Sequence, residues 1–202
     1  MKLDPFYPLV DSSDWVARLV PLGVKLVQLR IKDRPRPEIR AEIARSSDVC
    51  ARLGCQLVVN DYWEEAIAEG CDFVHLGQED LAEADLKAIR CAGLRLGVST
   101  HDGDELERAL SVDPEYIALG PVFPTGSKEL SWQPQGLERI AGWRRQTGNI
   151  PLVAIGGITL ETCSDVYRSG ANSIAVIGDV LRHDKPEQRA RDWLATSAPW
   201  RS

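Results

Sequence analysis

Two aspartates in the first half of the sequence each follow a short apolar run. Asp61 comes after residues 57–59, and Asp80 comes after residues 73–74. Runs of this length, flanked by polar residues and glycine, predict buried strands. Residues 62–70 between them are long enough for a crossover helix, so the two strands should be parallel neighbours. Both carboxylates would then lie at one mouth of the sheet, where two oxygen ligands with room around them suit Mg²⁺.

A cluster of cations follows an earlier apolar run. Arg30 and Lys32 are two residues apart. In an extended strand such residues point to the same face, so both should point into the same mouth. The fork of an arginine and the compact charge of a lysine together suit a diphosphate. Arg34 and Arg36 stand next to prolines and are interpreted as solvated. Gln28, inside the apolar run, needs a polar partner, which a network or a ligand would supply.

Residues 120–136 show no periodic apolar pattern and form the longest connection. They carry Thr125, Ser127 and Lys128. Loops of this length in compact domains are usually lids or binding loops. Hydroxyls and a lysine are what a closing phosphate clamp requires, whereas a proline-rich surface loop is the alternative interpretation.

Two turns marked by glycine end the last two apolar runs. Gly156 and Gly157 follow residues 152–155, and Gly178 follows residues 173–177. Barrels frequently bind phosphate in the loops after strands seven and eight, where glycine lets backbone N–H groups approach the oxygens. Each glycine alone would be explained by turn geometry. The two turns together favour a phosphate site.

Apolar runs and helical patterns alternate along the whole chain. Eight strand–helix units in 202 residues leave roughly 25 residues for each, the small end for a (β/α)₈ TIM barrel. An open doubly wound sheet is the rival, but no GxGxxG motif opens the chain. We predict a single-domain α/β barrel over residues 1–202, with a tail from about 196 to 202 that frays. The expected strands cover residues 6–10, 24–29, 57–59, 73–74, 94–98, 116–119, 152–155 and 173–177.

Composition limits the classes of function. A hydrophobic content of 44% supports one full core. The five cysteines form no CxxC pair and indicate buried thiols of a reducing compartment. No leader or long apolar run is present, so we expect a soluble cytoplasmic protein without a membrane partner. The net charge of −6 argues against nucleic acid, which leaves small-molecule substrates as the expected partners; a homo-oligomer stays open.

Six motifs carry a resemblance to a known family. They are QLRIK (28–32), VND (59–61), HLGQED (75–80), GVST (97–100), GPVFPT (120–125) with Lys128, and AIGGI (154–158). In this order, over about residues 7–180, they resemble thiamine phosphate synthase. The resemblance implies a transferase that joins 4-amino-5-hydroxymethyl-2-methylpyrimidine diphosphate to 4-methyl-5-(2-hydroxyethyl)thiazole phosphate. It also implies thiamine phosphate and pyrophosphate as products and Mg²⁺ as the cofactor.

The resemblance implies a role for each matched residue. The diphosphate leaves first, and the thiazole nitrogen captures the resulting cation, so charge on the leaving group must be stabilised. The implied metal ligands are Asp61 and Asp80. The implied diphosphate ligands are Asn60 and the catalytic Arg30, Lys32 and Lys128. Gln28 and Ser99 match positions near the pyrimidine, and the thiazole phosphate cradle matches Thr125, Ser127, Gly157, Ile177 and Gly178. His75 is given no catalytic role.

Two positions depart from the family pattern. Ser127 stands where a second threonine is usual and keeps the hydroxyl. Gly178 stands where serine is frequent, and the missing side-chain donor is worth about 0.5–1.5 kcal/mol of net hydrogen bonding. We therefore expect weaker affinity for the thiazole phosphate.

Three other functions remain as alternatives. A thiazole tautomerase has a similar barrel but does not handle the diphosphate, and the matched cations and carboxylates argue against it. A lyase that forms a Schiff base through Lys32 or Lys128 is another, since desolvated lysines act as nucleophiles. A barrel that binds phosphate or thiamine without turnover is the third, because barrels host many functions.

Overall fold

The apolar runs of the sequence form eight parallel strands that close into a barrel in sequence order. The structure is a computed structural model that describes residues 3–125 and 133–201. The last strand pairs with the first through Ile174 and Phe6, which closes the sheet. The strands are β1 (Phe6–Val10), β2 (Leu26–Leu29), β3 (Gln56–Asn60), β4 (Phe73–Leu76), β5 (Arg95–Thr100), β6 (Tyr116–Leu119), β7 (Leu152–Ile155) and β8 (Ser173–Val176). The predicted (β/α)₈ barrel is confirmed as a single domain.

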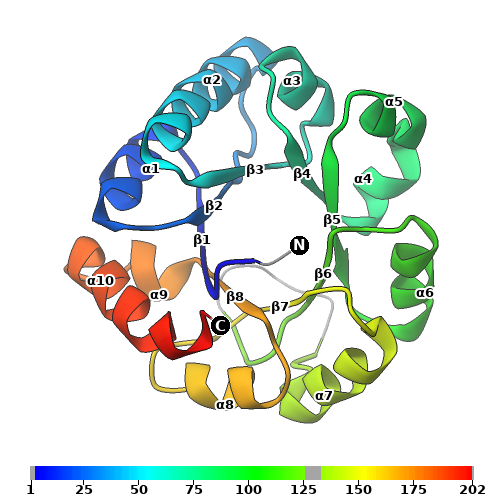
Figure 1. Ribbon diagram of the computed structural model, residues 1–202, viewed down its shortest axis with the longest axis vertical. Helices are drawn as coiled ribbons and strands as arrows, with labels where there is room; N and C mark the ends of the chain where they lie inside the picture. The colour runs from blue at the N-terminus through cyan, green and yellow to red at the C-terminus, as the bar shows by residue number, and fades with distance from the viewer. Residues whose placement is uncertain (1–2, 126–132, 202) are drawn as a thin grey trace.

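Helices form a ring around the strands (Figure 1). They are α1 (Ser13–Leu19), η1 (Val20–Leu22), α2 (Arg36–Leu53), α3 (Trp63–Ala68), α4 (Gln78–Glu83), α5 (Leu86–Cys91), α6 (Gly103–Ser111), α7 (Gly136–Thr147), α8 (Cys163–Arg168), α9 (Gly178–Leu181), α10 (Pro186–Ser197) and η2 (Ala198–Trp200). Local chemistry sets several ends: Asp102 accepts a hydrogen bond from the Glu105 N–H at 2.9 Å and begins α6, and Gly54 ends α2 at φ 61°. None of the described helices has the length and apolar composition that a membrane crossing needs.

Alternate residues of each strand point into the barrel or out to the helices. Phe6 points outward and stacks on Trp193 of α10, with ring centroids 5.5 Å apart. The inward side chains form a second apolar core, made of Leu3, Tyr7, Leu9, Leu26, Val58, Phe73, Tyr116, Ala118, Val153 and Ala175. Because these side chains fill the interior, a ligand must bind at an open end of the barrel.

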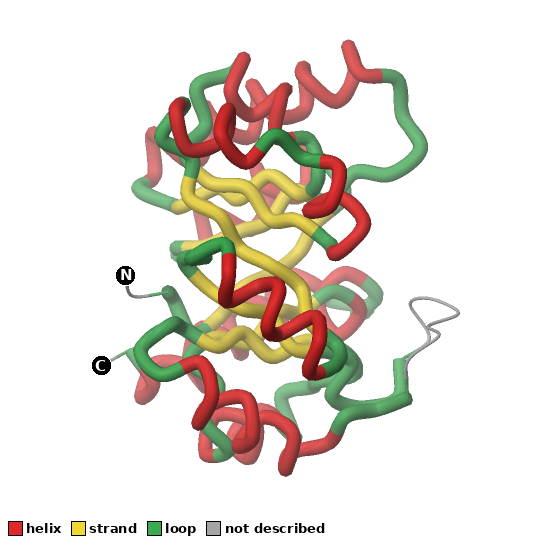
Figure 2. The backbone as a smooth tube through the Cα atoms, turned by 90° about the vertical axis from the view of Figure 1, so that its right-hand side faces the viewer, coloured by secondary structure: helices red, strands yellow, loops and turns green. Residues whose placement is uncertain are grey.

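The two chain ends lie at the same end of the barrel (Figure 2). Residues 196–201, which the sequence predicts to fray, are packed instead. Helix α10 continues to Ser197, and in η2 Trp200 stacks on Tyr167 at 4.9 Å between ring centroids. Arg201 then forms an ion pair with Asp4 at 2.8 Å. An aromatic contact and an ion pair therefore hold the tail onto the barrel.

Candidate functional site

Asp61 and Asp80 lie together at the C-terminal mouth of the barrel. Strands β3 and β4 are parallel neighbours in which Asn60 pairs with His75, and the Asp61 N–H donates to the His75 carbonyl at 2.9 Å. Asp80 lies in the first turn of α4, whose N-cap residue is Gly77. A Cβ atom at Gly77 would lie only 2.9 Å from Asp80 Oδ2, so glycine leaves the room that this carboxylate occupies.

The two carboxyl groups interact directly. Burial, then the charge of Asp80 and a hydrogen bond to it, raises the pKa of Asp61 to about 6, while Arg30 and Lys32 act in the opposite direction. Asp61 also has φ 65°, in the left-handed region that few residues other than glycine adopt. A strained backbone and a perturbed carboxyl group at a strand end are typical of functional positions.

This donor set fits a magnesium ion. Within residues 3–125 and 133–201, no three side chains of histidine, cysteine, aspartate or glutamate are grouped to hold a metal. Zinc sites of proteins use three or four such ligands. Two adjacent carboxylates instead suit Mg²⁺, which keeps water and substrate phosphate oxygens in its shell.

The predicted cations face the same mouth. The Arg30 N–H donates to the Val10 carbonyl at 2.7 Å, which extends the ladder between β1 and β2 by one residue. Arg30 is half-buried and Lys32 is exposed, and the charges of both act on Asp61. Positive charge therefore lies beside the carboxylate pair, as a bound diphosphate would require.

The other two arginines of this segment lie outside the site. Arg34 forms an ion pair with Glu42 of α2 at 3.4 Å, and Arg36 pairs with Glu65 of α3 at 3.0 Å. Both are exposed, in agreement with their interpretation as surface residues.

The glycine pair after β7 supports the base of the long loop after β6. The Val122 and Phe123 N–H groups donate to the carbonyls of Ile155 and Gly156, both at 2.9 Å. Gly157 has φ 66°, and a Cβ atom there would lie 2.8 Å from the Phe123 carbonyl oxygen. This close backbone packing is sufficient to explain the glycines, and it fixes one end of the predicted lid against β7.

The far end of that loop is held as well. The N–H groups of Gln135 and Gly136 donate to the carbonyls of Pro121 and Val122 at 2.8 and 2.9 Å. Thr125 lies in the described part of the loop and is half-buried. Ser127 and Lys128 lie outside the described residues.

The residues after β8 close the same end of the barrel. Ile177 packs against the interior apolar core, and Gly178 begins α9. A Cβ atom at Gly178 would meet only the Arg182 side chain, at 3.8 Å, so the site has space for a larger residue.

A chain of hydrogen bonds crosses the barrel interior below this mouth. Gln28 Nε2 donates to the Tyr7 hydroxyl at 2.9 Å, and the hydroxyls of Tyr7 and Tyr116 are 3.0 Å apart. The Tyr116 hydroxyl lies 2.8 Å from His75 Nδ1, and His75 Nε2 lies 2.8 Å from Ser99 Oγ. The two expected pyrimidine residues, Gln28 and Ser99, are therefore the ends of one network. The sequence did not reveal Tyr7 and Tyr116, because each resembles an ordinary aromatic residue of a strand.

Burial keeps the two tyrosines and the histidine in the middle of this hydrogen-bond network uncharged. It raises the pKa of both tyrosines well above the ordinary value, and burial with the charge of Arg30 lowers the pKa of His75 to about 3. Each phenol thus keeps its proton, and the imidazole carries one. At one end of the network, the Gln28 Oε1 atom is buried and has no hydrogen-bond partner among the described residues. An unsatisfied buried acceptor beside a ligand site indicates a donor on the ligand.

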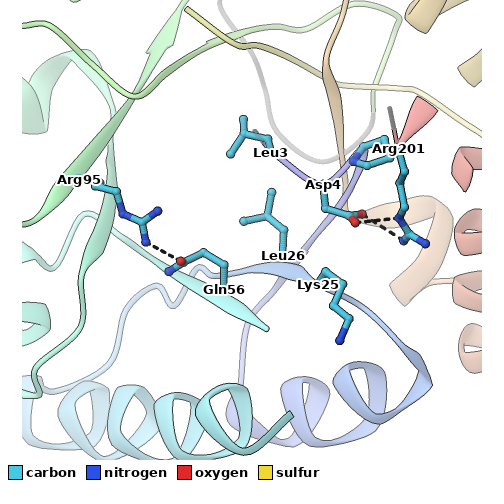
Figure 3. Close-up of a pocket in the computed structure, with 8 residues that line it drawn as sticks. Leu3, Asp4, Lys25, Leu26, Gln56, Arg95 and Arg201 are labelled. Carbon is cyan, nitrogen blue, oxygen red and sulfur yellow. Dashed lines mark hydrogen bonds and ion pairs between the residues drawn. The ribbon is translucent and has the colours of Figure 1, made fainter. Parts of the chain in front are cut away.

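A separate cavity of about 370 Å³ lies at the opposite end of the barrel, near both chain ends (Figure 3). Both of its arginines form ion pairs, Arg95 with Asp72 at 2.6 Å and Arg201 with Asp4 at 2.8 Å, and Lys25 donates to the Leu53 carbonyl at 3.3 Å. The cavity contains none of the predicted site residues. The opposite mouth, which carries Asp61, therefore remains the candidate site.

Comparisons with known proteins show which family the chain is similar to. A family profile described as thiamine monophosphate synthase matches residues 7–180. A thiamine-phosphate synthase of Rhizobium etli is 64% identical over 202 residues, 100% of this chain and 99% of that protein. One of Citrobacter koseri is 47% identical over 192 residues, 95% of this chain and 88% of that protein. The solved structure of a thiamine phosphate pyrophosphorylase from Pyrococcus furiosus has a TM-score of 0.87 at 25% identity, with coverage of 98% and 96% of the two chains.

The matched region begins at the second residue of β1, contains β2 to β8 in full, and includes every residue of the candidate site. The chain therefore belongs to the thiamine monophosphate synthase family.

Proposed function

We propose that this protein is a transferase that makes thiamine phosphate and pyrophosphate from the pyrimidine diphosphate and the thiazole phosphate named above. One observation carries the proposal: the carboxyl groups of Asp61 and Asp80 interact at the barrel mouth, beside the charges of Arg30 and Lys32. Carboxylates for a divalent cation next to the charges of an arginine and a lysine suit a diphosphate better than a single phosphate.

The protein would assist the reaction by stabilising the diphosphate as it leaves. Arg30, Lys32 and Asn60, with Lys128 from the loop after β6, would bind the diphosphate and offset the charge that builds on it as the bond breaks. Mg²⁺ held by Asp61 and Asp80 would supply further neutralisation of that charge. No side-chain nucleophile is required, because the thiazole nitrogen would form its bond to the methylene carbon from which the diphosphate has departed.

The remaining contacts would position the two rings. Gln28 and Ser99 lie at the ends of one hydrogen-bond network and would contact the pyrimidine. The thiazole phosphate would lie over the turns after β7 and β8, with the loop after β6 above it. The proposed contacts are Thr125, Ser127, Gly157, Ile177 and Gly178. The apolar interior below the site and a closed loop above it would keep water from the reactive cation.

The test is pyrophosphate release and thiamine phosphate formation from the two substrates, with Mg²⁺ and with a chelator. Turnover should require the metal and should collapse in Asp80→Ala. Glu79→Ala, which removes the exposed neighbouring carboxylate, is the matched control and should remain active. Absent turnover with retained binding of the thiazole phosphate would favour a tautomerase or a barrel that only binds its ligand.

A further inference from the structure

We propose that Tyr7, Tyr116 and His75 form a buried relay that fixes the hydrogen-bond polarity of Gln28 and Ser99, so that the site selects an amino-substituted pyrimidine over an oxo-substituted one. This inference rests on the proposed function and adds a cause for its substrate specificity. The three relay residues are positioning residues, because they act through the two residues at the ends.

The relay is continuous and comes from five different strands. Its contacts measure 2.9 Å from Gln28 to Tyr7, 3.0 Å from Tyr7 to Tyr116, and 2.8 Å from Tyr116 to His75 and from His75 to Ser99. These lengths are all those of good hydrogen bonds. The residues are buried, except that Ser99 is half-buried and so reaches the mouth.

Packing holds the relay in one arrangement. The rings of His75 and Tyr116 stack with centroids 5.5 Å apart and an interplanar angle of 12°. His75, Gly97 and Tyr116 are register partners on β4, β5 and β6. A Cβ atom at Gly97 would collide with the Tyr116 ring, so the ring crosses the barrel where glycine leaves space.

Each tyrosine hydroxyl and the neutral imidazole have one proton to donate. This number sets the donor and the acceptor in every hydrogen bond of the relay. Gln28 donates to the Tyr7 oxygen through Nε2, so the single Tyr7 proton is directed to Tyr116. The single Tyr116 proton is then directed to His75 Nδ1. A neutral imidazole with Nδ1 as acceptor carries its proton on Nε2 and donates it to Ser99.

The two ends of the relay therefore have opposite polarity toward a ligand. Ser99 has received a hydrogen bond, and its own proton is left to be donated. Gln28 has used one N–H of its amide nitrogen, and its Oε1 atom is left as a buried acceptor with no partner among the described residues. A 4-aminopyrimidine offers an amine donor and ring-nitrogen acceptors, which match this pair. With the 4-substituent toward Gln28 and the adjacent ring nitrogen toward Ser99, a 4-oxopyrimidine places a carbonyl acceptor against the Gln28 acceptor and a ring N–H donor against the Ser99 donor, which leaves both protein groups mismatched.

The direction of the relay can be measured without turnover. In the protein labelled with ¹⁵N-histidine, the His75 signal is assigned by its absence in His75→Gln. We expect the neutral tautomer with the proton on Nε2. A proton on Nδ1 would mean that the bonds run from Ser99 toward Gln28, and it would overturn the inference.

The consequence for specificity is measured with two substrates that differ only at the 4-position of the pyrimidine diphosphate. We expect the wild type to prefer the amino compound in kcat/KM by at least about a hundredfold. Tyr116→Phe keeps the ring but removes the central hydroxyl, so this preference should fall about tenfold. An unchanged preference in Tyr116→Phe would overturn the inference.

Tyr167→Phe is the matched control. It also removes a buried tyrosine hydroxyl, one that donates to the Pro5 carbonyl at 2.8 Å outside the relay. Its preference for the amino compound should equal that of the wild type, and a fall as large as in Tyr116→Phe would refute the relay. If the wild type converts neither compound, the proposed function fails, whereas the His75 tautomer still decides the polarity of the relay.

Discussion

The carboxyl groups of Asp61, directly after β3, and of Asp80, in the first turn of α4, interact at the barrel mouth. Two carboxylates this close repel each other when both are charged, and burial of Asp61 adds to that penalty. A dication between them would remove the repulsion. The metal-free protein should therefore be under electrostatic strain at neutral pH, and this strain can be measured.

The pH dependence of stability has a predicted sign. The pKa of Asp61 rises from 3.8 to about 6 on folding, so the folded state holds the proton more tightly than the unfolded chain does. The stabilisation from this proton is fully present below the unfolded pKa and is lost as pH rises toward about 6. Asp61→Asn has no proton to lose, and it should be more stable than the wild type above that pH in the presence of a chelator.

Thermal unfolding with a chelator between about pH 4 and pH 8 checks this prediction. Asp48→Asn, at an exposed position of α2, controls for the loss of one surface charge. Added Mg²⁺ should raise the Tm of the wild type and not that of Asp61→Asn. Equal pH profiles for the wild type and Asp61→Asn would show that the carboxyl groups do not interact.

The space at Gly97 is a second testable feature. The Tyr116 ring occupies the volume that a Cβ atom would need, so Gly97→Ala should lower the free energy of unfolding by about 1–3 kcal/mol. Gly103→Ala at the start of α6 adds the same methyl group where nothing lies within 4 Å, and it should be neutral or slightly stabilising. Urea unfolding distinguishes the two, and equal effects would contradict the packing described for Tyr116.

Much of the fold follows from the spacing of apolar runs. The bounds of β1 and β7 agree with the predicted residues 6–10 and 152–155, because each run begins after a proline and ends before a polar residue or glycine. Other bounds move: β2 begins at Leu26, two residues later than predicted, after the Gly23 turn. The packed tail was missed because Trp200 and Arg201 find their partners in distant segments, which a local pattern does not contain.

The site was predictable only in part, for a physical reason. Asp61 and Arg30 directly follow strands and Asp80 lies in the first turn of the helix after β4, and closure of a barrel brings these strand ends together regardless of detail. The relay depends instead on which side chains meet across the barrel interior. That is set by register, such as the pairing of Gly97 with Tyr116, and the register between two parallel strands is not readable from a single sequence.

The base of the loop after β6 gives a third prediction. Gly157→Ala would place a Cβ atom against the Phe123 and Pro124 carbonyls, so the loop should move away from the turn after β7. We expect KM for the thiazole phosphate to rise about tenfold or more, because the proposed phosphate contacts lie on these two segments. Gly148→Ala also has a positive φ, 56°, but no atom within 4 Å, and it controls for backbone strain alone. A KM equal to that of the wild type in Gly157→Ala would separate this turn from the phosphate site.

The last prediction concerns the position that departs from the family pattern. A side chain at Gly178 has space, since its Cβ atom would make only an ordinary contact with Arg182 at 3.8 Å. Gly178→Ser would add a hydroxyl donor at the N-terminus of α9, where the thiazole phosphate is proposed to bind. We expect Kd for this phosphate to fall by about twofold to tenfold, which corresponds to one net hydrogen bond. Gly178→Ala tests the methylene without the hydroxyl and should leave Kd close to that of the wild type in a calorimetric titration. If serine and alanine change Kd equally, the hydroxyl does not contact the phosphate, and backbone N–H groups alone bind it at this turn.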